Sequence, residues 1–194
     1  MAGSMSPTIG VLALQGAFRA HADAFAALGA RVREVRTAGD VEGLNAIVLP
    51  GGESTTMSKL LDSAALRRPL ADALQAGLPA FATCAGLILL AATVLDGRPD
   101  QTGFATLDVT VRRNAYGRQL DSFETDLDVN GLESPFHAVF IRAPLIEQLG
   151  EGVQVLARHD GHAVLVRQGS TMAMSFHPEL AGDHRLHARF LQEV

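Results

Sequence analysis

Cys84 is the only cysteine in the 194-residue sequence, and it stands between a short apolar segment and the small residues Ala85 and Gly86. A nucleophile on a sharp turn between a strand and a helix is exposed at the edge of its sheet. The start of a helix also favours the thiolate, which is the reactive form of cysteine. Taken alone, Cys84 fits a buried, unreactive cysteine equally well, so its chemistry depends on the groups around it.

His177 and Glu179 form a second candidate group, separated only by Pro178. Proline pushes the preceding residue into an extended conformation, and residues two apart in an extended chain point to the same side. The Glu179 carboxylate is therefore expected to hold one ring nitrogen of His177 and to leave the other free to face a thiol. Such a base and its orienting group activate a cysteine, although a histidine and a glutamate in a surface turn are the commoner case.

Two adjacent glycines, Gly51 and Gly52, follow a buried apolar run. Glycines allow backbone N–H groups to turn inward and form half of an oxyanion hole, and the N–H of Ala85 would supply the other half. The alternative is an ordinary turn with Ser54 or Thr55 as a helix N-cap. A phosphate-binding loop is disfavoured because the lysine of that motif is missing.

A scaffold must bring these three groups together, and the apolar pattern of the chain predicts one. Strands and helices alternate through the first half, and strands dominate the second half. We expect an α/β fold: a single three-layer domain with a mostly parallel central sheet, helices on both faces and an antiparallel extension. The expected strands cover residues 9–14, 31–35, 46–49, 80–83, 107–111, 126–129, 139–141, 153–157, 163–166 and 172–176. The expected helices cover residues 17–28, 55–61, 66–76, 87–95 and 183–191.

Three of the expected strands end immediately before the candidate groups, at residues 49, 83 and 176. In open α/β sheets, ligands bind beyond the carboxyl ends of the strands. Each candidate group is a weak signal alone. Three parts of one mechanism at one edge of one sheet form a much more specific pattern.

Composition and charge exclude several classes of protein. The formal net charge is −5, the pI is about 5.8 and 47% of the residues are hydrophobic, which predicts one globular domain and no nucleic-acid binding. A single cysteine excludes an internal disulfide and fits a reducing, cytoplasmic location. The longest apolar run, residues 85–95, is too short to span a membrane. We expect residues 1–8 to be a disordered or tag-derived start and residues 9–194 to form the domain.

Six short segments are recognisable when taken together. They are ALQG at 13–16, LPGGESTT at 49–56, TCAG at 83–86, RNAYGRQ at 113–119, FIRAP at 140–144 and SFHPEL at 175–180. The pattern Cys…His-x-Glu is typical of class I glutamine amidotransferases. The segments PGGEST, RNxxGRQ and IRAP narrow the resemblance to one family within this class. From about residue 9 to its C-terminus, the sequence resembles the glutaminase subunits of pyridoxal 5′-phosphate synthase. The resemblance implies the flavodoxin-like fold of the class I glutamine amidotransferases.

The resemblance also implies a role for each candidate residue. Cys84 is then the nucleophile, His177 the general base and acid, and Glu179 the orienting carboxylate. The N–H groups of Gly52 and Ala85 would form the oxyanion hole. The glutamine-binding residues implied in this way are Gly52, Glu53, Ser54, Arg113, Ile141 and Arg142.

The residue types of the implied glutamine site suit this substrate. Glu53 fits an α-ammonium group, and an arginine fits an α-carboxylate through paired N–H donors. Without the resemblance, Arg113 and Arg142 would be interpreted as solvated surface arginines. Gln15 stands at the end of the first expected strand, where it either helps to control the oxyanion loop or is a structural amide.

The reaction implied by the resemblance is hydrolysis of L-glutamine to L-glutamate and ammonia. The implied partner is the (β/α)₈-barrel subunit of pyridoxal 5′-phosphate synthase, in a large hetero-oligomer that receives the ammonia. No cofactor is expected, and no metal, because Cys84, His177 and Glu179 lack the close paired spacing of structural zinc ligands. Three rivals stay open: another class I amidotransferase, a different cysteine hydrolase such as a peptidase, and a non-catalytic binding module.

Three positions depart from the family pattern. Ala82 stands where glycine is common, two residues before Cys84, and adds a methyl group to a tight turn. Ala20 replaces an acid after the first expected strand, and Arg112 replaces an acid beside Arg113. None of these positions belongs to the implied triad.

Overall fold

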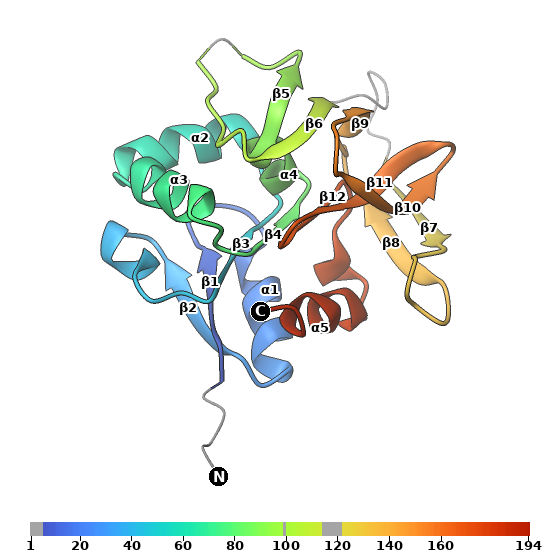
Figure 1. The fold of residues 1–194 in the computed structure, drawn as a ribbon, viewed down its shortest axis with the longest axis horizontal. Helices are drawn as coiled ribbons and strands as arrows, with labels where there is room; N and C mark the ends of the chain where they lie inside the picture. Colours follow the sequence, from blue (N-terminus) through green and yellow to red (C-terminus); the bar gives the residue numbers. More distant parts are fainter. Residues whose placement is uncertain (1–5, 99, 114–121) are drawn as a thin grey trace.

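The computed structural model describes residues 6–98, 100–113 and 122–194, and a seven-stranded sheet forms its centre (Figure 1). The strands of this sheet are β2 (Arg31–Val35), β1 (Thr8–Leu12), β3 (Ala46–Leu49), β4 (Ala80–Thr83), β12 (Thr171–Met174), β11 (His162–Gln168) and β10 (Gln154–His159), in spatial order. The strands from β2 to β12 are parallel, and β11 and β10 continue the sheet in antiparallel orientation. This confirms the predicted α/β class with its antiparallel extension.

Helices cover both faces of the sheet because the strands alternate their side chains between two apolar cores. The helices are α1 (Phe18–Ala27), α2 (Ser54–Ser63), α3 (Arg67–Gln75), α4 (Ala85–Leu90) and α5 (Arg185–Leu191), with short 3₁₀ turns η1 (Ala38–Val41) and η2 (Pro178–Leu180). Ile47 and Leu49 of β3 lie in the core shared with α2, α3 and α4. Ala46 and Val48 lie in the core shared with α1 and α5.

Two small sheets flank the central one (Figure 1). The first contains β5 (Ala91–Leu95), β6 (Leu107–Arg112) and β9 (Leu145–Leu149), and the second is the hairpin of β7 (Phe123–Leu127) and β8 (Phe136–Phe140). Leu107 of β6 packs in the core with α2, α3 and α4, whereas Phe136 and Phe140 of β8 pack in the core with α1 and α5. Each small sheet therefore extends one of the two cores.

Most predicted elements are confirmed, but the helix expected over residues 87–95 is wrong. Helix α4 ends at Leu90, and β5 occupies the rest of that range. The apolar run shows no clear period, and the β-branched Thr93 and Val94 favour a strand. Strand β9 was not predicted, because Glu147 and Gln148 interrupt its apolar pattern. The strands expected at 126–129 and 139–141 begin earlier, at residues 123 and 136.

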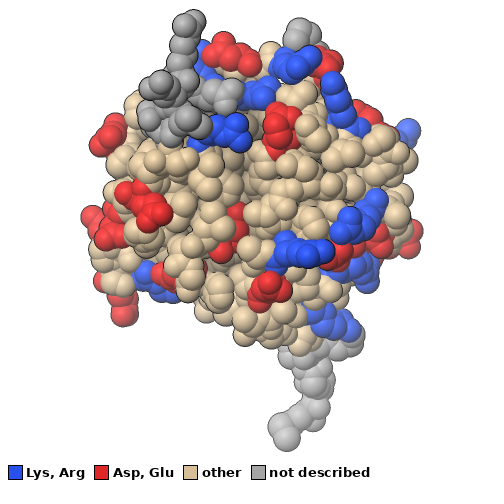
Figure 2. Space-filling view, turned by 180° about the vertical axis from the view of Figure 1, so that it is seen from behind, with Lys and Arg blue, Asp and Glu red and all other residues tan. Residues whose placement is uncertain are grey.

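The first strand begins at Thr8, one residue before the predicted start of the domain. Residues 1–5 lie outside the described residues, so the division of the chain at residue 8 stays a prediction. Within the described ranges, no helix has the length and apolar character needed to cross a membrane. On the face shown in Figure 2, acidic and basic side chains are interspersed.

Candidate active site

Cys84 directly follows β4 and directly precedes α4, on the sharp turn predicted from the sequence. Its backbone has a φ of 47° and a ψ of −102°, a conformation that costs a non-glycine residue about 1–3 kcal/mol. The N–H of Cys84 donates to the carbonyl oxygen of Met174 at 2.8 Å, and the N–H of Ile88 donates to the carbonyl oxygen of Cys84 at 3.2 Å. Hydrogen bonds on both sides therefore hold the strained turn in place.

His177 comes shortly after β12, the strand that pairs with β4. In this parallel pairing Met174 lies opposite Thr83, so the chain leaves both strands at the same edge of the sheet. The N–H of His177 donates to the carbonyl oxygen of Val139 in β8 at 2.9 Å. The pairing of two strands that are distant in the sequence thus brings His177 to the side of Cys84.

Glu179 lies in η2, and its Oε1 is 2.8 Å from Nδ1 of His177. Both side chains are buried, and the remaining ring nitrogen is left for Cys84. Burial opposes a positive charge on His177, but its interactions with Cys84 and Glu179 outweigh this effect and raise the pKa of His177 to about 10. The pKa of Glu179 stays below its usual value, because the His177 contact and the nearby histidines outweigh the effect of burial. A protonated imidazole favours the thiolate of a neighbouring cysteine, which is the arrangement of an activated cysteine.

Two glycines permit the close packing of these segments. A Cβ at Gly51 would overlap the imidazole ring of His177, and a Cβ at Gly86 would overlap the backbone of Leu49. The glycine loop therefore lies directly against the candidate base, and α4 begins directly against the end of β3. A larger residue at either position would push the reacting groups apart.

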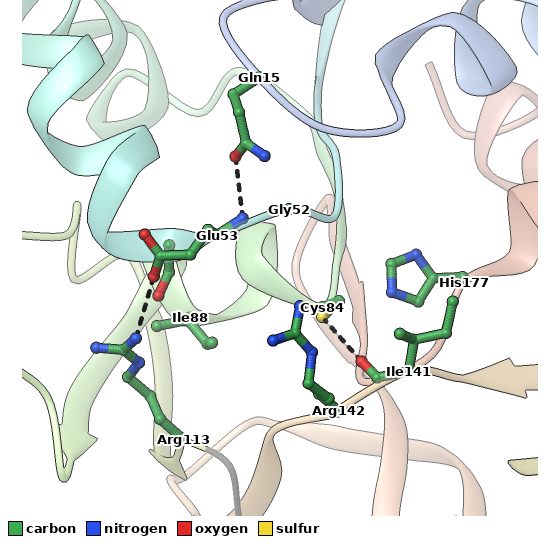
Figure 3. A pocket seen from close by; sticks show the side chains of 10 residues that line it. Gln15, Gly52, Glu53, Cys84, Ile88, Arg113, Ile141, Arg142 and His177 are labelled. Carbon is green, nitrogen blue, oxygen red and sulfur yellow. Dashed lines mark hydrogen bonds and ion pairs between the residues drawn. The ribbon is translucent and has the colours of Figure 1, made fainter. Parts of the chain in front are cut away.

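The residues around Cys84 line a pocket of about 380 Å³, within the usual range for small-molecule sites. All predicted site residues line it except Ala85 and Glu179, which are buried next to Cys84 and His177. Ile88 of α4 also lines the pocket and was not predicted, because an apolar residue in a short helix is usually part of the core. The lining residues, shown in Figure 3, are Gln15, Gly52, Glu53, Ser54, Cys84, Ile88, Arg113, Ile141, Arg142 and His177.

Glu53 ends the glycine loop and caps α2. Its carboxylate accepts hydrogen bonds from the N–H groups of Thr55 at 3.0 Å and Thr56 at 2.6 Å, so the N-cap is Glu53 rather than Ser54 or Thr55. Burial opposes ionisation of Glu53, but these hydrogen bonds outweigh it and lower its pKa to about 2. The N–H of Glu53 donates to Oε1 of Gln15 at 2.9 Å (Figure 3), so Gln15 holds the loop from the end of β1.

Arg113 and Arg142 reach the pocket from different elements. Arg113 follows β6, donates to Gln101 at 2.7 Å and pairs with Glu53 at 3.2 Å. Arg142 follows β8 with a φ of 44° and is exposed. Among the residues that the structure describes, none forms a hydrogen bond or an ion pair with the Arg142 guanidinium, which lies near Cys84 in Figure 3. An unpaired guanidinium beside a pocket is suited to an anionic group.

The three departures from the family pattern lie outside the pocket lining. Arg112 forms ion pairs with Asp96 and Glu147, on the surface of the sheet that contains β5, β6 and β9. Ala82 is buried inside β4, and Ala20 lies on α1. None of these side chains touches the pocket.

Two buried histidines behind Glu179 were missed by the sequence analysis. His21 of α1 and His187 of α5 have no exposed surface, and Nε2 of His21 is 3.3 Å from Oε2 of Glu179. The signal was present in the sequence, because His21 has the helical spacing of the buried Ala24 and Phe25. A histidine on the apolar face of a helix is the pattern that would have revealed it.

Residues 114–119, which contain most of the predicted RNxxGRQ segment, lie outside the described residues. In the part of the chain that the structure describes, no group of three or more His, Cys, Asp or Glu side chains is arranged to hold a metal ion.

Comparisons with known proteins identify the family of this chain. Residues 11–194 match the SNO glutamine amidotransferase family. Proteins named pyridoxal 5'-phosphate synthase subunit PdxT from Mycobacteroides abscessus and Frankia alni are 53% and 56% identical to this chain, over 98% and 97% of its length and 98% and 95% of theirs. A crystal structure of a glutamine amidotransferase is 50% identical, with a TM-score of 0.89 over 95% of this chain and 97% of that chain. This chain therefore belongs to the SNO family of glutamine amidotransferases.

Proposed function

We propose that this protein is the glutaminase subunit of a pyridoxal 5′-phosphate synthase and hydrolyses L-glutamine to L-glutamate and ammonia. One observation carries the proposal: Cys84 and His177 line one pocket, and Glu179 holds the far side of the imidazole. The family membership and the names of the relatives support the choice of substrate and synthase.

The proposed reaction uses Cys84, His177 and Glu179 as a triad. The Cys84 thiolate attacks the side-chain carbonyl carbon of glutamine, and the N–H groups of Gly52 and Ala85 hold the resulting oxyanion. Protonated His177 gives its proton to the departing ammonia, which leaves a thioester on Cys84. His177 then takes a proton from water, and the hydroxide breaks the thioester to release glutamate. Glu179 keeps the imidazole oriented through both steps.

The proposed binding mode uses the charges at the pocket. The Arg142 guanidinium takes the α-carboxylate of glutamine, because it has no other partner among the described residues. Glu53 takes the α-ammonium group, since its low pKa keeps it ionised at neutral pH. Arg113 supports Glu53 through their ion pair, while Ser54 and Ile141 form the walls beside the substrate.

The ammonia is passed, in this proposal, to a (β/α)₈-barrel synthase subunit within a large cytoplasmic hetero-oligomer. The names of the relatives describe subunits of a synthase, which supports a docked glutaminase rather than a solitary one. Gating by the partner would limit the release of ammonia without an acceptor. The triad chemistry and the ammonia transfer are separate parts of the proposal and need separate measurements.

One coupled assay tests both parts. Glutamate release and pyridoxal 5′-phosphate formation are measured from glutamine with purified protein, with and without the cognate synthase subunit. We expect glutamate release that increases with the partner, together with modification of Cys84 by a glutamine-like electrophile. No glutamate release in the presence of the partner would refute the proposal, and activation by a different synthase would favour another class I amidotransferase.

A further inference from the structure

A chain of buried side chains continues from Glu179 into the core, away from the pocket. Nε2 of His21 lies 3.3 Å from Oε2 of Glu179 and 3.3 Å from Oγ1 of Thr83. Nδ1 of His21 lies 3.0 Å from Nε2 of His187. The carboxylate that holds His177 with one oxygen therefore meets a second histidine with the other.

Two arrangements of protons fit the contact between the two buried histidines. In the first, His187 donates from Nε2 to Nδ1 of His21, and the Nε2–H of His21 faces Oγ1 of Thr83 and Oε2 of Glu179, each 3.3 Å from Nε2. In the second, His21 donates from Nδ1 to His187, and its Nε2 lone pair accepts from the Thr83 hydroxyl. An ionised carboxylate only accepts hydrogen bonds. The second arrangement therefore directs a lone pair at a buried anion, and the first does not.

The surroundings of His187, at the far end of this row of buried side chains, also favour the first arrangement. Nδ1 of His187 is buried and has no hydrogen-bond partner among the described residues. In the first arrangement this atom is an unpaired acceptor, whereas in the second it carries an unpaired N–H. A buried N–H without an acceptor is the rarer of the two situations in protein backbones. Oε2 of Glu179 is likewise buried and without a hydrogen-bond partner among the described residues, and Nε2 of His21 lies 3.3 Å from it.

We propose, as an extension of the proposed triad, that His21 is a positioning residue whose Nε2–H holds Oε2 of Glu179, so that Oε1 stays against His177. His187 fixes the tautomer of His21 that allows this contact. The carboxylate of the triad would thus be held between two imidazoles, one facing the substrate and one facing the core.

The surroundings of His21 and His187 favour the neutral form of both rings. Burial lowers the pKa of His21 to about 4, with Glu179 opposing this effect and His177 adding to it. Burial, together with His21 and His184, lowers the pKa of His187 to about 3, against the opposing charge of Asp183. Both histidines are therefore neutral at neutral pH, and each has one N–H to donate.

Two substitutions at His21 separate positioning from packing. Glutamine brings an amide nitrogen near the place of Nε2 and keeps a donor for Glu179, whereas asparagine reaches only the place of Nδ1. In the assay with the synthase partner, we expect His21→Asn to lower kcat about 10- to 100-fold with little change in KM. We expect His21→Gln to stay within about threefold of the wild type, because the donor is retained. The exposed His162→Gln is the matched control and keeps the wild-type kcat.

The outcomes are distinguishable. A wild-type kcat in His21→Asn would overturn the positioning role, and so would equal losses in the asparagine and glutamine variants, which a packing role predicts. Wild-type protein that releases no glutamate with its partner would instead defeat the proposed function.

Nitrogen-15 NMR of the histidines in wild-type protein tests the arrangement without any substitution. We expect His21 to be the neutral tautomer protonated at Nε2, with its signal assigned through its ring contact with Phe81. A tautomer protonated at Nδ1 would overturn the proposal even if the variants failed to fold, because a lone pair would then face Glu179.

Discussion

The reaction side and the binding side of the pocket are built differently. On the reaction side, Cys84, His177 and Glu179 are no more than 8% exposed, and paired strands or buried histidines support them. On the binding side, Glu53 and Arg142 are exposed. Close packing fixes a buried group in one geometry, whereas the exposed charges depend on local hydrogen bonds and on ion pairs that solvent screens. In the proposed function, the core therefore sets the chemistry of this site, and the exposed side chains select the substrate.

Removing the nucleophile is the strongest test of this division. Cys84→Ala is expected to lower kcat by at least about 10⁴-fold, because the covalent step is lost. Glutamine binding, measured by calorimetry, should persist because Glu53 and Arg142 are unchanged. A variant that still releases glutamate at the wild-type rate would contradict the assignment of the reaction side.

Changing the orienting carboxylate should have the next largest effect. Glu179→Gln presents an amide to His177 and is expected to lower kcat about 10²- to 10⁴-fold with little change in KM, since the imidazole loses its preferred tautomer. Steady-state glutaminase kinetics with the partner measure both constants. Glu193→Gln, which removes a surface pair with Arg167, is the matched control. An increase in KM without a change in kcat would place Glu179 on the binding side instead.

The contact between Gly51 and His177 predicts a steric effect. In Gly51→Ala the added Cβ would meet the imidazole ring, and a displacement of about 1 Å can cost about 100-fold in rate. Gly39→Ala is the control, because a Cβ at that position meets no atom within 4 Å. Kinetics and thermal unfolding of both variants give the comparison. Equal activity of the two variants would show that His177 tolerates displacement.

A substitution on the binding side should instead raise KM. Arg142→Lys keeps the charge but loses the paired N–H donors, so we expect KM for glutamine to rise about 10-fold while kcat is retained. Arg158→Lys, on the exposed side of β10 where Arg158 donates to the carbonyl oxygen of Gly161, should behave as wild type. If Arg142→Lys lowered kcat and left KM unchanged, the division between the two sides would fail.

The smallest expected effect is on the pH dependence of stability. The pKa of His177 is raised from 6.5 to about 10, so its stabilising effect is complete below pH 6.5 and is lost as the pH rises toward 10. The pKa values of His21 and His187 are lowered from 6.5 to about 4 and about 3, so stability is lost as the pH falls below 6.5. The lowered pKa of Glu53 affects stability only at pH values below 4.5, which is the ordinary pKa of a glutamate.

Thermal unfolding over a range of pH values measures this balance. We expect Tm to be highest near pH 6.5 and the loss toward alkaline pH to shrink in His177→Asn. A wild-type Tm that rises steadily from neutral to alkaline pH would contradict the raised pKa of His177.

The proximity of Cys84, His177 and Glu179 was predictable from the sequence because each part of the proposed triad follows a short apolar strand. His177 and Glu179 are two residues apart, which fixes their relative direction once the chain is extended. The position of a residue after a strand and the spacing of two residues can both be seen in the sequence without knowledge of distant contacts. The same local reasoning failed for residues 87–95, since an uninterrupted apolar run does not distinguish a buried helix from a strand.

The surroundings of the triad were harder to predict because they depend on tertiary contacts. His21 and His187 come from opposite ends of the chain and meet only after α1 and α5 pack on the same face of the sheet. The capping role of Glu53 and its pair with Arg113 likewise join separate elements. Spacing along the sequence carries little information about such contacts.

The position of β12 has a consequence for synthesis of the chain. This strand lies between β4 and β11 in the middle of the sheet, yet it is made near the end of translation. Synthesis proceeds from the N-terminus and a domain generally folds as a unit, so the nascent chain contains Cys84 long before β12 and His177 are available to complete the sheet and the site. A chain that is cut short before residue 171 lacks an interior strand, and we expect it to be unfolded and unable to release ammonia.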